Sequence, residues 1–198
     1  TFIALDDYID EYMPNFKSIM ESDPTMKSLA TSADGHIYGL PAKKPCRPTV
    51  GNQLFINKTW LDNLGLDVPT TYDEFVDVLR AFKEQDANGN GDASDEIPYG
   101  TGNADATMFF CLPFGVRVGG ENTYSMTMED GSPVFIPTSE EYKAGIKAMH
   151  ECYQEGLIDP EVFTQDTSMR DAKLMSETPI VGCAAGWTAD ATFGANAD

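Results

Sequence analysis

Histidines and basic residues are scarce in this sequence, and each shortage restricts the functions it can support. Two histidines, His36 and His150, occur in 198 residues, and no nucleophile motif accompanies either of them. Lysine and arginine number 13 against 32 aspartates and glutamates, which gives a formal net charge of −19. Because such a surface repels phosphate backbones and anionic lipids, nucleic acid and membrane surfaces are poor candidate partners.

Long apolar runs and paired cysteines are also missing. No apolar stretch of the sequence is long enough to cross a bilayer. The four cysteines, at positions 46, 111, 152 and 183, form no Cys-x-x-Cys pair, which argues against a zinc site. We interpret them as buried thiols, and one disulfide stays open if the protein is extracellular. The chain begins at Thr1 without an initiator Met and ends in a small, polar stretch, so we interpret it as a piece of a longer protein.

Alternating strand and helix signals predict an α/β domain. Hydrophobic residues make up 41% of the chain, which is enough for a folded core. Short apolar runs predict strands at 36–40, 52–57, 97–99, 134–136 and 180–185. Helical spacing predicts helices at 6–20, 58–64, 104–114 and 167–175, and others that begin at 71 and 138. Because helices separate the strands, βα units are expected.

Polar residues mark where several of these helices start. Asp6 is expected to cap the first helix, and Pro14 is expected to kink or divide it. The capping-box pattern is a Ser or Thr followed three residues later by Glu or Gln, whose side chains satisfy each other's backbone N–H groups. It occurs twice, at Thr71 with Glu74 and at Thr138 with Glu141.

Residues 86–96, called here the acidic loop, carry the most specific chemical pattern. Their sequence is Asp-Ala-Asn-Gly-Asn-Gly-Asp-Ala-Ser-Asp-Glu, with oxygen-bearing side chains at every second position up to the serine. Asp86, Asn88 and Asn90, followed by Gly91, match the first half of an EF-hand calcium loop. The last EF-hand ligand would be Ile97, which cannot bind a cation, so a calcium sensor is not expected. We favour a structural Ca²⁺ site over the alternative, a solvated acidic turn.

Three segments together resemble the extracellular solute-binding proteins of family 1, the ligand receptors of ABC importers. They are FINKTWLDNLGLDVPTTYDEF at 55–75, DANGNGDASDEIP at 86–98 and YQEGLIDPE at 153–161. The resemblance implies a periplasmic-binding-protein-like α/β fold with two lobes that close on a ligand. It also implies a layout for this chain: residues 1–48 as a remnant of the first lobe and a connector, 49–181 as the second lobe, and 182–198 as the return crossing and a further first-lobe remnant.

The resemblance also completes a ligand set for the acidic loop. In the family loop an Asp-Glu pair supplies the late calcium ligands, and Asp95 and Glu96 correspond to that pair here. Asp92 is expected to contribute its backbone carbonyl, and Ser94 a water-mediated contact. This sequence has one extra residue between Gly91 and the pair, so the geometry of the late ligands is the open point.

Candidate ligand-binding residues lie near the two expected crossings between lobes. Trp187 follows the strand at 180–185, where its indole can stack on a sugar ring and donate a hydrogen bond. The alternative for Trp187 is ordinary packing in the core or between lobes. The remaining candidates are polar, and for each the alternative is a surface or capping role: Arg47, Asn52, Tyr38 and Asn103.

Taken with the resemblance, these observations predict a binding protein and not an enzyme. The expected ligand is a small solute, best satisfied by a sugar or oligosaccharide, and the expected partners are ABC permease subunits. The parent is expected to be an extracellular, cell-surface lipoprotein, and no direct membrane insertion is expected of this segment. The rival interpretations are a calcium-stabilised extracellular enzyme acting on polysaccharides, and a calcium-dependent adhesion module.

Overall fold

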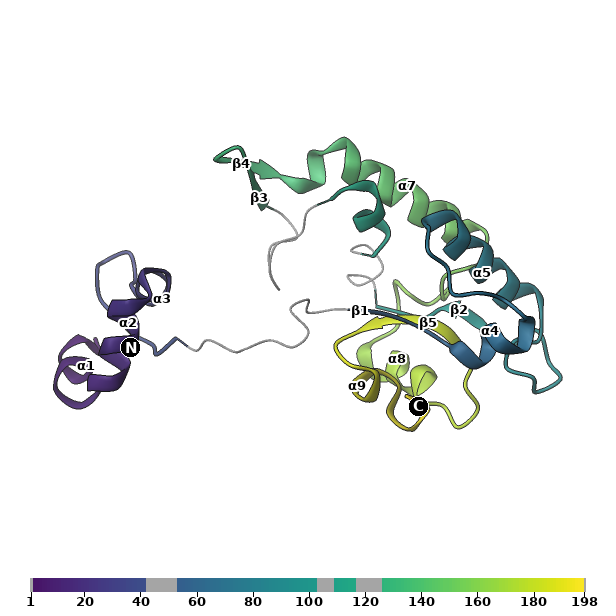
Figure 1. The fold of residues 1–198 in the computed structure, drawn as a ribbon, viewed down its shortest axis with the longest axis horizontal. Coiled ribbons are helices and arrows are strands. Elements are labelled where there is room, and N and C mark those ends of the chain that lie inside the picture. The colour runs from purple at the N-terminus through teal and green to yellow at the C-terminus, as the bar shows by residue number, and fades with distance from the viewer. Residues whose placement is uncertain (1, 42–52, 103–108, 117–125, 198) are drawn as a thin grey trace. The chain divides into compact units, whose positions relative to one another are not determined.

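The computed structural model describes residues 2–41, 53–102, 109–116 and 126–197, the side chain of Glu129 excepted. The chain divides into two compact units, Thr1–Arg47 and Pro48–Asp198, and each is described by itself (Figure 1). Within the described ranges, no helix is both long and apolar enough to cross a membrane.

The smaller unit contains three short helices, α1 (Asp6–Tyr12), α2 (Pro14–Ser22) and α3 (Pro24–Ala30). Pro14 occupies the first turn of α2, so the helix expected at 6–20 is divided there, as predicted. Ile9, Met20 and Ile37 form the buried core of this unit. A small apolar cluster thus holds the three helices together.

Two predictions for this unit are wrong. Asp6 does not cap α1, because its Oδ2 atom faces another segment and accepts a hydrogen bond from the N–H of Ile37 at 3.3 Å. The segment 36–40 is no strand, since Ile37 forms only a single antiparallel bridge with Thr31. The first error arises because the partner of Asp6 lies 31 positions away in the sequence, where no local signal indicates it.

The larger unit is built on a three-stranded sheet with the order β1-β5-β2. The central strand β5 is antiparallel to β1 and parallel to β2. A separate antiparallel hairpin pairs β3 with β4. The elements are, in chain order, β1 (Gln53–Ile56), α4 (Lys58–Leu64), α5 (Tyr72–Glu84), β2 (Ile97–Tyr99), η1 (Leu112–Phe114), β3 (Met126–Glu129), β4 (Ser132–Phe135), η2 (Ile136–Thr138), α7 (Glu140–Gln154), α8 (Thr167–Leu174), β5 (Val181–Gly186), α9 (Ala189–Phe193) and η3 (Gly194–Asn196).

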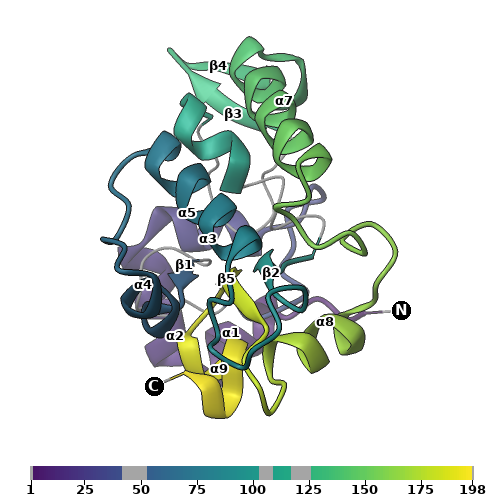
Figure 2. The ribbon, with the colours of Figure 1, turned by 90° about the vertical axis from the view of Figure 1, so that its right-hand side faces the viewer.

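Helices cover both faces of this sheet, as Figures 1 and 2 show, with α5 and α7 on one side and α8 and α9 on the other. Adjacent residues of β5 point to opposite sides: Cys183 belongs to the core beneath α5 and α7, whereas Ala184 packs with α8 and α9. The first core is the larger and includes Trp60, Phe82 and Tyr99, all almost fully buried. An α/β domain with two covered faces is therefore confirmed.

Local signals located most of these elements correctly. The α4 helix spans 58–64, as predicted, and Gly65 ends it in a left-handed conformation with φ 66°. Thr71 and Glu74 form the expected capping box of α5. The strand expected at 134–136 is shifted to Ser132–Phe135, and Ile136 begins η2 instead. Of the helix expected at 104–114, positions 104–108 lie outside the described residues.

The second predicted capping box is wrong. Ser139 caps α7, and its Oγ accepts a hydrogen bond from the N–H of Tyr142 at 3.1 Å. Thr138 lies one residue too early because it belongs to η2, where its Oγ1 donates to the carbonyl of Phe135 at 2.8 Å. Because the short η2 turn includes Thr138, the N-cap of α7 is the next residue, Ser139.

Candidate functional site

The acidic loop folds inward around the carboxylate of Asp86. Its Oδ1 atom accepts hydrogen bonds from the N–H groups of Gly89 at 2.8 Å and Asn90 at 3.0 Å. Its Oδ2 atom accepts a third from the N–H of Gly91 at 2.8 Å. Gly89 and Gly91 have positive φ values of 76° and 94°, which suit glycine and let the chain bend this sharply.

A second carboxylate gathers the two asparagine side chains of the loop. Asn88 Nδ2 donates to Asp95 Oδ1 at 3.1 Å, and Asn90 Nδ2 donates to Asp95 Oδ2 at 2.7 Å. The sequence-predicted ligands Asp86, Asn88, Asn90 and Asp95 therefore lie in one hydrogen-bonded network. The Asp92 side chain is separate from them, because it accepts from the N–H and Oγ of Ser94, which lowers its pKa.

Glu96 connects the loop to the folded body. Its Oε1 atom accepts from the N–H of Ala87 at 2.9 Å, and Asn63 on α4 donates to the Ala87 carbonyl at 2.9 Å. The other oxygen, Glu96 Oε2, is buried and makes no hydrogen bond to the part of the chain that the structure describes. A buried carboxylate oxygen without a donor is costly, and a bound cation would satisfy it.

The oxygen atoms of the acidic loop are of the kind that a hard cation takes. In the described ranges no three His, Cys, Asp or Glu side chains are grouped as a metal site. The loop combines carboxylates with asparagine amide and backbone oxygens, however, and that oxygen-rich mixture is the donor type Ca²⁺ takes. Its donor chemistry therefore fits calcium, and such a site would need the oxygens of Asn88 and Asn90 alongside the acids.

Trp187 lies directly after β5 with 44% of its surface exposed. Its backbone carbonyl accepts a hydrogen bond from Gln53 Nε2 on β1 at 2.9 Å. Gly186 pairs with Gln53 across the two strands, and a Cβ at Gly186 would collide with the side chain of Thr192 on α9. The half-exposed indole therefore follows a backbone segment that is hydrogen-bonded to β1 on one side and packed closely against α9 on the other.

The other predicted ligand residues belong to the smaller unit or lie outside the described residues. Tyr38 belongs to the smaller unit, where its hydroxyl donates to Asp34 Oδ2 at 2.8 Å. Arg47, Asn52 and Asn103 lie outside the described residues. The grouping of these four residues with Trp187 stays a prediction.

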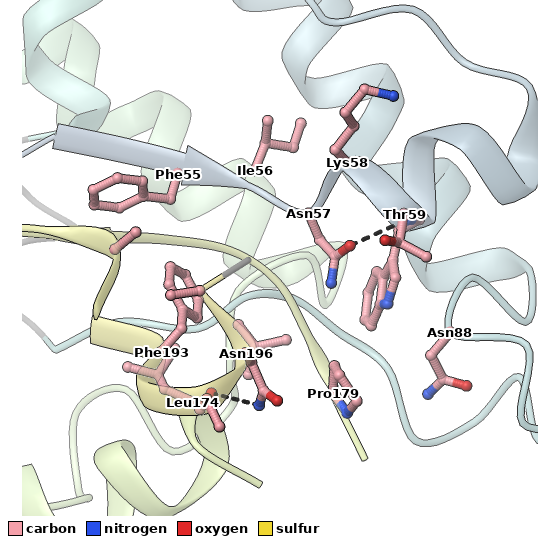
Figure 3. A pocket seen from close by; sticks show the side chains of 15 residues that line it. Phe55, Ile56, Asn57, Lys58, Thr59, Asn88, Leu174, Pro179, Phe193 and Asn196 are labelled. Atoms are coloured by element: carbon pink, nitrogen blue, oxygen red, sulfur yellow. Dashed lines mark hydrogen bonds between the residues drawn. The ribbon is translucent and has the colours of Figure 1, made fainter. Parts of the chain in front are cut away.

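One pocket could not be predicted from the sequence. A pocket of about 490 Å³ opens where β1 and the start of α4 meet β5 and α9 (Figure 3). Phe55 and Phe193 form part of its wall and contact each other edge to face, with centroids 5.9 Å apart. Asn88 of the acidic loop also lines it. The pocket joins segments more than 100 residues apart in the chain, so no local pattern could have indicated it.

The sheet that the chain enters by β1 and leaves by β5 has helices on both faces, and solved structures that are 36–37% identical to the chain place this α/β domain in the periplasmic-binding-protein class. The chain belongs to the bacterial extracellular solute-binding protein family, whose model matches residues 2–192. This confirms the resemblance inferred from the three sequence segments.

Relatives of the chain include named carbohydrate-binding proteins. The fructooligosaccharide ABC transporter substrate-binding protein FusA of Streptococcus pneumoniae is 40% identical over 181 residues, which is 86% of this chain and 33% of FusA. A structure of FusA with kestose superposes with a TM-score of 0.77 at 36% identity, over 97% of this chain and 40% of that one. An HMO-binding solute-binding protein of Bifidobacterium longum infantis superposes over 100% of this chain and 42% of its own, with a TM-score of 0.85 at 37% identity.

Two further related structures concern an EF-hand or calcium. One is an EF-hand mutant of FusA in complex with fructo-nystose, which is 34% identical with a TM-score of 0.75 over 97% of this chain and 40% of that one. The other is the alginate-binding protein AlgQ2 without calcium ion, which is 28% identical with a TM-score of 0.78 over 96% of this chain and 38% of that one. The chain therefore spans well under half the length of these relatives.

Proposed function

We propose that this chain is part of an extracellular receptor that binds an oligosaccharide and delivers it to an ABC importer. The observation that carries the proposal is the 40% identity to a fructooligosaccharide-binding protein over most of the chain. Binding, not catalysis, is the activity proposed, because the named relatives are binding proteins. Attachment to the cell surface as a lipoprotein is part of the proposal, since another relative, 28% identical, is named lipoprotein LipO of Bacillus subtilis.

The proposed mechanism is closure of two lobes over the sugar. In this scheme residues 49–181 supply most of one lobe, and residues 1–48 and 182–198 belong to the other lobe and the crossings. Trp187 lies where β5 leaves the sheet, and its half-exposed indole offers a flat apolar face to a sugar ring. Closure would bury that face with the ligand and present a different surface to the permease.

Calorimetry on the full-length protein tests this function. Kestose, chitin oligosaccharides and unrelated peptides would be titrated under the same conditions. Binding of at least one oligosaccharide with no heat from the peptides is the expected result. Tight binding of peptides without any response to the sugars would overturn the carbohydrate proposal.

We also propose that the acidic loop binds Ca²⁺ in a structural role. The support is the inward network of Asp86, Asn88, Asn90 and Asp95, the buried Oε2 of Glu96, and the related structures concerned with an EF-hand and with calcium. The Asp92 backbone carbonyl completes the proposed set. A cation bound by the folded loop alone would stabilise the fold, because the unfolded chain does not hold these oxygens together.

Thermal unfolding with added calcium, and again with a chelator, tests the ion. Addition of Ca²⁺ is expected to raise the midpoint of the parent protein and to leave Asp95→Ala unchanged. Asp92→Ala is the matched control, because it removes a loop carboxylate whose side chain accepts from Ser94 and is not a proposed ligand. Equal calcium responses in the unsubstituted protein, Asp95→Ala and Asp92→Ala would show that the loop is an acidic turn and not a calcium site.

A further inference from the structure

The acidic loop contains both Asn-Gly pairs of the sequence, Asn88-Gly89 and Asn90-Gly91. An asparagine side chain can react with the backbone nitrogen of the next residue. Glycine in that next position favours the reaction, because it has no side chain to obstruct the approach and adopts unusual backbone angles readily. Two such pairs in tandem make the loop the most reactive asparagine segment expected from the sequence.

The structure holds the reacting groups of both pairs away from this reaction. Each nucleophilic nitrogen, that of Gly89 and that of Gly91, donates its N–H to Asp86 at 2.8 Å. The amide of each asparagine is held from the other side by Asp95. Attack therefore requires at least one of these hydrogen bonds to open first.

We propose that Asn90 is a deamidation site whose reaction is restrained by Asp86. When the Gly91 nitrogen leaves Asp86 and loses its proton to solvent base, it bonds to the side-chain carbonyl carbon (Cγ) of Asn90. The bond from that carbon to Nδ2 breaks, and the nitrogen leaves as ammonia after taking a proton from water. The resulting succinimide then adds water at either carbonyl and opens to aspartate or isoaspartate, with no oxidant or reductant involved.

Asn90 reacts before Asn88 because it is the more exposed to water. The Asn90 side chain is exposed, whereas Asn88 is half-buried and lines the pocket beside α4. The backbone N–H of Asn88 also lies 3.4 Å from Glu96 Oε1, next to the hydrogen bond that ties Ala87 to the same atom. Access to water and distance from the folded body therefore favour the second pair.

Deamidation would change the chemistry of the loop in a defined way. Aspartate at position 90 adds a negative charge to a loop whose Asn90 side chain now contacts Asp95 at 2.7 Å. That contact changes from a donated hydrogen bond to like-charge repulsion. The inference rests on the hydrogen bonds of the two pairs. Because Asp86 is also a proposed Ca²⁺ ligand, every rate is measured with a chelator present.

The test is a time course of the full chain in mildly alkaline buffer, followed by peptide mapping with mass spectrometry. The product is recognised by the mass change from NH₂ to OH, and aspartate and isoaspartate are separated by chromatography. Deamidation is expected first at Asn90, and its rate is expected to be several-fold higher in Asp86→Ala than in the unsubstituted protein. Asp92→Ala removes a carboxylate from the same loop without touching either glycine N–H, so its rate should stay near the parent's.

Asp86→Glu provides a rescue, since a carboxylate in that position should slow the reaction again. Circular dichroism of each variant checks that it is folded, and mapping of the other asparagines in the same digest reports any general unfolding. Equal acceleration of deamidation in Asp86→Ala and Asp92→Ala would show that the lost negative charge, and not the hydrogen bonds to Asp86, controls the rate. That result would overturn the proposal. A slower reaction in Asp86→Ala, or faster deamidation at an asparagine outside the loop, would overturn it as well.

Discussion

Arg80 on α5 and Glu155 at the end of α7 form a two-pronged ion pair. Arg80 Nε donates to Glu155 Oε2 at 2.8 Å, and Nη2 donates to Oε1 at 3.0 Å. Lys83, one turn further along α5, donates to the backbone carbonyl of Glu155. The ends of the two helices that cover one face of the sheet are thus joined. The hydrogen bonds from Arg80 hold the pKa of Glu155 below its ordinary value.

Replacement of this arginine should lower stability in a pH-dependent way. Because the folded-state pKa of Glu155 is lowered, its contribution is present above the ordinary glutamate pKa and is lost as pH falls through the folded-state pKa. Both side chains are about two-fifths exposed, so the loss at neutral pH in Arg80→Ala is expected to be only ~0.2–1 kcal/mol. Urea unfolding at neutral and acidic pH measures it.

The control for this pair is Lys143→Ala, which removes a longer, more exposed contact with Glu140 at 3.3 Å. That variant should lose less stability at neutral pH, because a one-pronged surface pair contributes little. An Arg80→Ala deficit that is the same at both pH values would contradict the role assigned to Glu155.

Gly182 on β5 is expected to tolerate no side chain. A Cβ there would lie 2.5 Å from Cδ2 of Phe82 and 2.9 Å from Cε3 of Trp60, both in the main core. Gly182→Ala should therefore destabilise the larger unit by ~1–3 kcal/mol through overpacking. Gly39→Ala is the matched control, since nothing lies within 4 Å of its added Cβ and it should be close to neutral. Chemical denaturation compares the two, and equal stabilities would contradict the packing described.

Structural features that depend on a few neighbouring residues, such as helix caps and helix ends, could be predicted from the sequence. The capping box of Thr71 and the end of α4 at Gly65 were found because each signal and its effect lie within one helical turn. The spacing of Asp86, Asn88 and Asn90 likewise indicated a loop whose polar side chains share one hydrogen-bonded network, and their role as Ca²⁺ ligands stays a proposal. Contacts between distant segments were not: Gln53 and Trp187 are separated by 134 positions, and no local pattern links them. The same holds for the pocket wall of Phe55 and Phe193.

Ser139, not Thr138, should be the residue on which the start of α7 depends. Ser139→Ala removes the oxygen that accepts from the N–H of Tyr142, and such a loss costs ~1 kcal/mol in typical helices. Thr138→Ala removes only an exposed hydrogen bond to the Phe135 carbonyl and should cost less. Thermal or urea unfolding ranks the two variants. The reverse order would restore the cap predicted from sequence and contradict the structure.

Trp187 and Gln53 should affect ligand binding to different degrees, if the oligosaccharide proposal holds. Trp187→Ala removes the proposed stacking surface and is expected to weaken binding at least tenfold, which corresponds to ~1.4 kcal/mol. Trp187→Phe keeps an aromatic face and should bind with intermediate affinity. Calorimetry with the best oligosaccharide on the full-length protein measures these changes.

Gln53→Ala leaves the indole in place and removes only the hydrogen bond to the Trp187 carbonyl. Its affinity should fall less than that of Trp187→Ala, because the pairing of β1 with β5 still positions the backbone before the indole. Acrylamide quenching of the 198-residue chain in a Trp60→Phe background, where Trp187 is the remaining tryptophan of these residues, reports directly on that side chain. Unchanged quenching in Gln53→Ala would show that β1 does not position the indole, whatever the sugar affinity. Full affinity in Trp187→Ala would remove the residue from the binding site.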